Sequence, residues 1–164
     1  MTNHETEIRN ALTKYEALLR SQLERVERIN TAGDAVDYTK LDKITIGVCG
    51  GDGIGPIITD ASAKVLEYLL TDDVKRGRIV FKHIDGLTIE NRAAHMQAIP
   101  DDVMAELKSC DVILKGPTTT PRAGDPWPNI ESANVAMRKA LDLFANVRPV
   151  KVPEEGIDWT FFRE

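Results

Sequence analysis

The first thirty residues carry apolar side chains at alternating spacings of three and four. Most of the positions between them are charged or polar, and no Pro or Gly occurs before Gly33. Gln22 is the one polar residue that falls in the apolar register. This spacing predicts an amphipathic helix of about seven turns over residues 1–30. Its apolar positions are Ile8, Leu12, Tyr15, Leu19, Val26 and Ile29.

Two roles are open for this helix. Its apolar face could pack back on the domain that follows, or it could contact a partner or another subunit, because its length is near that at which two helices pair along a seam. The polar stretch 31–43 contains Gly33 and predicts a linker. The pattern thus divides the chain into a helix, a linker and a domain over residues 44–164.

Residues 44–164 alternate between short apolar runs and amphipathic segments. Runs at 44–49, 79–84 and 111–114 are typical of buried strands, and the run 143–145 predicts a further strand that ends near Arg148. Such alternation favours an α/β layered fold with a largely parallel sheet.

Helices are predicted between these strands. Pro56 and Pro100 suit first turns, Thr88 can cap a short helix through residue 94, and a further helix begins near Ser132. The expected inward-facing side chains are Ile58, Ala61, Val65 and Leu69 in the first helix, and Val103, Met104 and Leu107 in the third.

Composition narrows the classes of function. Hydrophobic residues make up 42% and charged residues 29% of the chain, the net charge is −5, and no basic stripe interleaved with aromatics is present. These values are typical of a globular protein and disfavour nucleic-acid binding. The sequence shows neither a secretory signal nor a membrane-spanning run, which predicts a cytoplasmic protein. Cys49 and Cys110 are expected to be free thiols.

After the first predicted strand, glycines at positions 51, 53 and 55 alternate with other residues. A dinucleotide-binding fingerprint needs its third glycine three residues after the second, and Pro56 occupies that place. We therefore expect a tight turn with unusual backbone angles near a site.

Three arginines occur with neutral hydrogen-bonding side chains near the end of the chain. Asn134 and Arg138 are four residues apart and would share one face of the helix that begins near Ser132, and Arg148 and Arg163 follow. Guanidinium groups that converge could grip a small substrate with several carboxylates. Taken singly, each arginine would be an ordinary surface residue.

Four segments together resemble the isocitrate/isopropylmalate dehydrogenases. They are residues 50–56 (Gly-Gly-Asp-Gly-Ile-Gly-Pro), 115–121 (Lys-Gly-Pro-Thr-Thr-Thr-Pro), Ser132-x-Asn134-x-x-x-Arg138 and 145–149 (Ala-Asn-Val-Arg-Pro). The resemblance runs from about Ile44 to the last residue, in the family order. It implies the three-layer α/β fold of that family and a metal-assisted oxidative decarboxylation with NAD or NADP.

The resemblance also implies roles for single residues. Thr119 would face the nicotinamide, whereas Arg138, Arg148 and Arg163 would grip two substrate carboxylates. Ser132 and Asn134 stand where isopropylmalate enzymes offer leucines, and they suit a third carboxylate instead. Isocitrate is therefore favoured, with isopropylmalate and homoisocitrate behind. Ser132 can also serve as a helix N-cap. The loop 122–131 is longer than we expect in the isocitrate enzymes.

The catalytic lysine and tyrosine and the aspartates that bind Mg²⁺ or Mn²⁺ follow the Phe162-Arg163-Glu164 segment in the family pattern. We therefore assign no catalytic or metal-binding residue within the 164 residues. The expected partners are an isocitrate-like tricarboxylate, a C-terminal half or companion subunit, and further copies in a homo-oligomer. The alternative is a non-catalytic binding or assembly subunit. The sequence does not decide between NAD and NADP.

Overall fold

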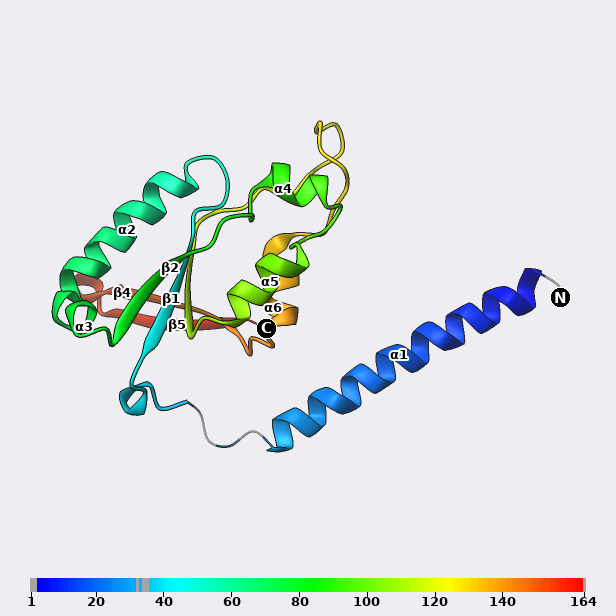
Figure 1. Cartoon of the computed structure of the whole chain (residues 1–164), viewed down its shortest axis with the longest axis horizontal. Coiled ribbons are helices and arrows are strands. Elements are labelled where there is room, and N and C mark those ends of the chain that lie inside the picture. Colours follow the sequence, from blue (N-terminus) through cyan, green and yellow to red (C-terminus); the bar gives the residue numbers. More distant parts are fainter. Residues whose placement is uncertain (1–2, 32, 34–35, 164) are drawn as a thin grey trace. The chain divides into compact units, whose positions relative to one another are not determined.

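The computed structural model describes residues 3–31, 33 and 36–163. The chain divides into two compact units, Met1–Lys40 and Leu41–Glu164 (Figure 1). Parts of three predicted segments lie outside the described residues: residues 1–2 of the helix, 32 and 34–35 of the linker, and Glu164 of the last motif. None of the helices in the described part of the chain is both long and apolar enough to cross a bilayer.

The first unit is built on one long helix, α1 (Asn3–Thr31), and the predicted amphipathic helix is confirmed. Every side chain described in α1 is exposed. A 3₁₀ turn, Tyr38–Lys40, lies within the polar stretch that follows.

The second unit is organised around a three-stranded parallel sheet. Its strands are β1 (Ile44–Cys49), β2 (Ile79–His83) and β3 (Val112–Lys115), in the order β2-β1-β3. β1 is central: it pairs in parallel with β2 on one side and with β3 on the other. The first strand matches its predicted bounds, β2 ends one residue early, and β3 is displaced by one residue.

Helices cover both faces of this sheet (Figure 1). α2 (Gly55–Leu69) and α3 (Thr71–Lys75) lie on one face, and α5 (Asp101–Lys108) and α6 (Ala133–Ala140) lie on the other. Successive side chains of a strand point to opposite faces. Ile46 and Val48 of β1 therefore belong to the core under α2, and Cys49 belongs to the core under α5 and α6. The three-layer α/β fold is confirmed.

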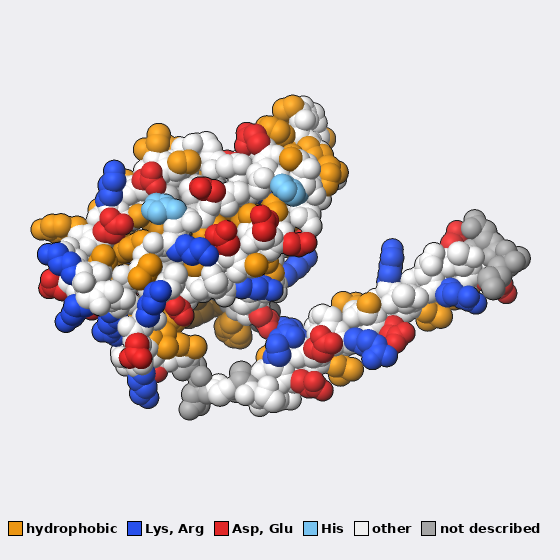
Figure 2. Space-filling model, in the orientation of Figure 1, with side chains coloured by type: hydrophobic (Ala, Val, Ile, Leu, Met, Phe, Trp, Pro, Cys, Tyr) orange, Lys and Arg blue, Asp and Glu red, His pale blue; other side chains and the backbone are white. Residues whose placement is uncertain are grey.

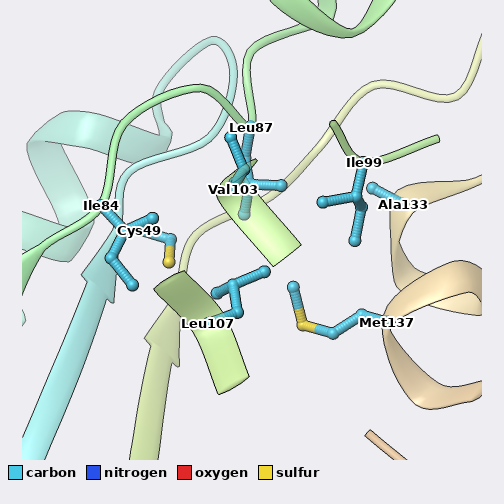
Figure 3. Packing of buried hydrophobic residues seen from close by; sticks show 8 residues of the cluster. All are labelled: Cys49, Ile84, Leu87, Ile99, Val103, Leu107, Ala133 and Met137. Atoms are coloured by element: carbon cyan, nitrogen blue, oxygen red, sulfur yellow. The ribbon is translucent and has the colours of Figure 1, made fainter. Parts of the chain in front are cut away.

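The larger core joins the sheet to α5 and α6 (Figure 3). Val103 and Leu107 of α5 point into it as predicted, and Met104 packs against it. The predicted short helix is α4 (Ile89–Ala94), where the hydroxyl oxygen of Thr88 accepts a hydrogen bond from the Asn91 amide at 3.4 Å. The buried members of this core are Cys49, Ile84, Leu87, Ile99, Val103, Leu107, Ala133 and Met137.

The predicted inner face of α2 is wrong. The buried side of the helix carries small residues, Gly55, Thr59 and Ala63, which let the backbone approach the sheet closely. The larger apolar residues expected there face outward, and Leu69 is 69% exposed. Because α2 carries apolar side chains on more than one side, hydrophobicity alone did not identify the packed side. The outward set is Ile58, Ala61, Val65 and Leu69.

The predicted strand 143–145 is also wrong. The backbone of these residues is irregular, and Phe144 is 89% exposed. These residues belong to the turn that ends α6. Asp142 has a positive φ, and the Leu143 amide donates to the Arg138 carbonyl at 3.0 Å. The strand begins afterwards, as β4 (Asn146–Val152), which pairs antiparallel with β5 (Ile157–Arg163) across a 3₁₀ turn, Pro153–Glu155.

Candidate functional site

Two loops meet at the carboxyl ends of β1 and β3. The chain leaves β1 through residues 50–54 and leaves β3 through residues 116–121. After β1 the chain adds β2 on one side and β3 on the other. Open α/β sheets bind ligands at such a reversal of strand order, outside the carboxyl ends of the strands. The topology therefore marks these two loops as a candidate site.

Backbone contacts hold the two loops together. The Asp52 amide donates to the Pro117 carbonyl at 2.8 Å, and the Gly116 amide donates to the Cys49 carbonyl at 2.8 Å. Gly51 has φ +71°, and a Cβ there would overlap the Pro117 carbonyl oxygen. The predicted tight turn is confirmed. The second loop approaches so closely that there is no room for a side chain at Gly51.

The carboxylate of Asp52 fixes the second loop. Its Oδ2 accepts from the Thr119 amide at 2.6 Å, and its Oδ1 accepts from the Ile89 amide at 2.7 Å. A charged acceptor makes stronger hydrogen bonds than a neutral one. One side chain from the glycine loop thus positions both Thr119 and the start of α4.

Arg92 of α4 is a fully buried arginine, 0% exposed, and it binds three backbone carbonyls. Its Nε donates to Ala98 at 2.8 Å, its Nη1 to Thr119 at 2.8 Å and its Nη2 to Glu131 at 3.2 Å. Burial lowers the pKa of Arg92, and the nearby charge of Asp52 opposes this shift. The guanidinium therefore links the Thr119 loop to the residue just before Ser132.

Neither Asp52 nor Arg92 was predicted as a site residue from the sequence. Asp52 lies inside a motif that was interpreted through its glycines, and Arg92 looks like an ordinary charged residue of a short helix. Arg92 stands three residues after the buried Ile89, hence on the same helix face, and that spacing is the one local sign of its burial.

The side chain of Lys115, the last residue of β3, hydrogen-bonds to the start of the second loop. Its Nζ donates to the Gly116 carbonyl at 2.8 Å and to Thr118 Oγ1 at 3.1 Å. Burial lowers the pKa of Lys115, whereas it raises the pKa of the Cys49 thiol to about 11 against the opposing charge of Lys115. Cys49 and Cys110 are both free, and Cys49 stays a protonated thiol at neutral pH.

Both backbone groups of Thr119 are thus engaged, its amide by Asp52 and its carbonyl by Arg92. Its side chain is half-buried. The loop that follows, residues 122–131, turns at Gly124 and helps line a pocket of about 350 Å³. This pocket lies beside the Thr119 segment in sequence, at the loop that the sequence analysis marked as unusually long.

α6 carries three of the predicted substrate-binding residues. Ser132 occupies the N-cap position with extended backbone, but its side chain makes no capping hydrogen bond. Asn134 and Arg138 follow on one face of the helix, and both are exposed. The predicted helix start and the shared face are confirmed.

The β4–β5 hairpin carries the other two. Asn146 lies opposite Arg163 in the register, and Arg148 is two residues further along β4. Both arginines therefore project from the same face of the hairpin. Arg148 Nε donates to Asn146 Oδ1 at 3.1 Å, and both guanidinium groups are exposed. Among the described residues, no hydrogen bond or ion pair joins Arg138 to this hairpin face.

Metal donors do not gather anywhere in the part of the chain that the structure describes. No three His, Cys, Asp or Glu side chains there are placed to hold a metal ion. The described residues therefore do not fit the donor set that a divalent cation needs.

Comparison with known proteins gives a consistent result. A family model described as isocitrate/isopropylmalate dehydrogenase matches residues 45–163. The chain is 37% identical to an isocitrate dehydrogenase [NADP] of Caldococcus noboribetus, over 75% of this chain and 30% of that protein. It is 35% identical to a 3-isopropylmalate dehydrogenase of Staphylococcus saprophyticus, over 62% of this chain and 29% of that protein.

A solved structure shares the fold. The crystal structure of a β-decarboxylating dehydrogenase from Thermococcus kodakarensis aligns with a TM-score of 0.59 and 29% identity, over 73% of this chain and 33% of that one. The chain thus spans about a third of the length of these relatives.

Proposed function

The chain belongs to the isocitrate/isopropylmalate dehydrogenase family, and on that premise we propose that it provides the substrate-binding and nicotinamide-facing part of an isocitrate dehydrogenase. The proposed reaction oxidises the hydroxyl of isocitrate by hydride transfer to NAD or NADP and releases carbon dioxide to give 2-oxoglutarate. A divalent cation, Mg²⁺ or Mn²⁺, supplies charge stabilisation in such a reaction. Its ligands, like the acid and base groups, are expected outside this sequence.

The observation that carries the proposal is the start of α6. Ser132 stands at the N-cap with no capping hydrogen bond from its hydroxyl, and Asn134 follows with an exposed amide. Both can therefore donate to a ligand. A carboxylate at this place would gain hydrogen bonds that an aliphatic branch cannot make, and leucine there would leave the carboxylate unpaired. This favours a tricarboxylate over isopropylmalate.

The arginines are proposed to bind the remaining two carboxylates. Arg148 and Arg163 share one face of the hairpin, and Arg138 shares a helix with Ser132 and Asn134. Each guanidinium offers a planar fork that matches a carboxylate. Because none of the three is buried in the described chain, each is free to turn toward a bound anion.

Thr119 is proposed to contact the nicotinamide. Asp52 and Arg92 hold its backbone from both sides, so its hydroxyl is presented from a fixed loop. Rigid support of this kind is what a cofactor contact needs, because small displacements at the reacting carbon lower the rate steeply.

A chimera tests the proposal. Residues 45–163 of this chain would replace the matching segment of the Caldococcus noboribetus isocitrate dehydrogenase, and the product would be assayed with both nicotinamide cofactors. We expect oxidation of isocitrate. A chimera that shows a cooperative thermal transition but oxidises isopropylmalate alone would establish the second candidate, which the 35% identical 3-isopropylmalate dehydrogenase favours. A folded chimera active on neither substrate would contradict both.

Substrate choice should depend on the start of α6. In the chimera, Ser132→Leu with Asn134→Leu should lower kcat/KM for isocitrate about 100-fold, since a buried carboxylate loses about two hydrogen bonds at roughly 1.5 kcal/mol each. Isopropylmalate turnover should fall less. Val135→Leu with Ala140→Leu adds two leucines at other exposed positions on the same helix and serves as the control. Equal losses on both substrates would mean that Ser132 and Asn134 act only on the helix start.

Arg148→Lys should weaken isocitrate binding although the charge is kept. An ammonium cannot reproduce the two parallel hydrogen bonds of a guanidinium, so the loss of one charge-assisted bond should raise KM about tenfold, or about 1.5 kcal/mol. Arg76→Lys, at an exposed arginine that pairs with Asp73 on the α2/α3 side, is the matched control. Steady-state kinetics that do not distinguish the two variants would remove Arg148 from the site.

A further inference from the structure

The α1 helix presents a long apolar stripe that the proposed enzymatic role does not use. The stripe follows a seven-residue repeat in which the first and fourth positions are apolar, with one exception, Gln22. Its side chains are between 45% and 62% exposed, and apolar side chains also appear along this helix in Figure 2. They are Ile8, Leu12, Tyr15, Leu19, Val26 and Ile29.

We propose that α1 is an oligomerisation helix, which packs in parallel and in register against α1 of a second copy of this chain. The helix has 29 residues, enough for about four heptads, and contains neither Pro nor Gly. A seven-residue register kept over that length matches the seam of another long helix. The surface of a globular domain is irregular and gives no reason for so sustained a register.

Charge favours the same helix as partner. Between residues 3 and 31 the sequence has five Asp or Glu and five Lys or Arg residues, so α1 carries no net charge with His neutral. A second copy is therefore not repelled. An anionic membrane surface or a nucleic acid would be expected to select an excess of basic residues, which α1 lacks.

Gln22 favours the parallel, in-register arrangement. In that arrangement Gln22 meets Gln22 of the second copy, and the two amides can hydrogen-bond to each other. The antiparallel alignment that overlaps the whole helices would place Gln22 against Leu12, where its amide has no partner, and Glu16 beside Glu16. A single polar residue in an apolar seam is a known way to fix register.

Two flanking leucines agree with the same arrangement. Leu18 directly precedes a seam position and Leu23 directly follows one, five residues later in the sequence, and both are more than half exposed. In a parallel pair these two flanking positions contact each other across the seam. The contact widens the apolar stripe on both sides of Gln22.

Mass in solution tests the proposal on the full chain. Leu12→Glu with Leu19→Glu puts charges in the seam, while Thr13→Glu with Ser21→Glu adds the same charge to the other side of α1 as the matched control. We expect sedimentation to give a mass of at least twice the 18.2 kDa of one chain for the natural protein and the control. The seam variant should fall at least twofold in mass. Equal masses for all three proteins would overturn the proposal.

Cross-linking tests the orientation separately. Gln22→Cys should form a disulfide between two copies under mild oxidation, because the two positions meet in the parallel seam, whereas Ser21→Cys should form little. Equal cross-linking of both variants, or none at Gln22→Cys, would overturn the parallel arrangement. A seam variant that loses thermal stability without losing mass would show that α1 packs on its own chain, and would also overturn the proposal.

Discussion

We expect the purified chain to leave isocitrate unoxidised with NAD or NADP, in the presence of Mg²⁺ or Mn²⁺. The site residues proposed for this chain bind substrate or cofactor, and the family pattern implies that the lysine, tyrosine and aspartates of the reaction follow the segment 162–164. Within the described residues no metal-binding group of three donors exists. Each missing acid or base removes a factor of about 10²–10⁴, so turnover should fall below that of the chimera by on the order of 10⁴ or more.

The chimera that tests the proposed function is the natural control for this result, because it contains the same residues 45–163. An active chimera beside an inactive chain would show that these residues serve the reaction and do not perform it alone. Turnover by the isolated chain that co-purifies with it through two different columns, and that Arg148→Lys diminishes, would contradict the prediction.

The elements that the sequence predicted well are those with strong local signals. β1 is a continuous apolar run, and α4 and α6 start where Thr88 and Ser132 predict them. In each case a few neighbouring residues determine the backbone, through β-branched side chains in the strand and N-cap residues at the helices.

Elements that depend on distant partners were predicted less well. The packed face of α2 is the one with Gly55, Thr59 and Ala63, because a close approach to the sheet is worth more there than burying its large side chains. The strand 143–145 failed because helix closure at Asp142 takes precedence over the β propensity of the apolar run. Neither outcome is visible without the neighbouring element.

The residues of the candidate site likewise fall into those with a local sequence signal and those that depend on distant partners. The resemblance singled out Thr119 and the α6 residues, which lie in contiguous motifs. Asp52 and Arg92 escaped notice because they act on residues 67 and 27 positions away along the chain, through backbone groups that carry no sequence signature. Hydrogen bonds from side chains to a distant backbone, which support the site, are therefore visible only in the structure.

Replacing Arg92 should have the largest effect on stability among the residues that support the site. Arg92→Met should lower the free energy of unfolding by about 3–5 kcal/mol, because three backbone carbonyls each lose a hydrogen bond from a charged donor, worth roughly 1–2 kcal/mol apiece. Urea denaturation of the full chain measures this. Arg76→Met, at an exposed arginine, should change it by no more than about 0.5 kcal/mol.

The conservative variant separates a local role from a general one. Arg92→Lys keeps the charge but cannot reach all three carbonyls, so the chain should fold with an intermediate loss of stability. Limited proteolysis should then cut residues 119–131 faster than in the natural protein, since Arg92 binds the carbonyls at both ends of that segment. In the chimera the same variant should raise KM for the cofactor more than KM for isocitrate, because the Thr119 loop loses one of its two anchors. If Arg92→Lys changed neither the rate of proteolysis nor the cofactor KM, Arg92 would be a residue of the core that does not support the site.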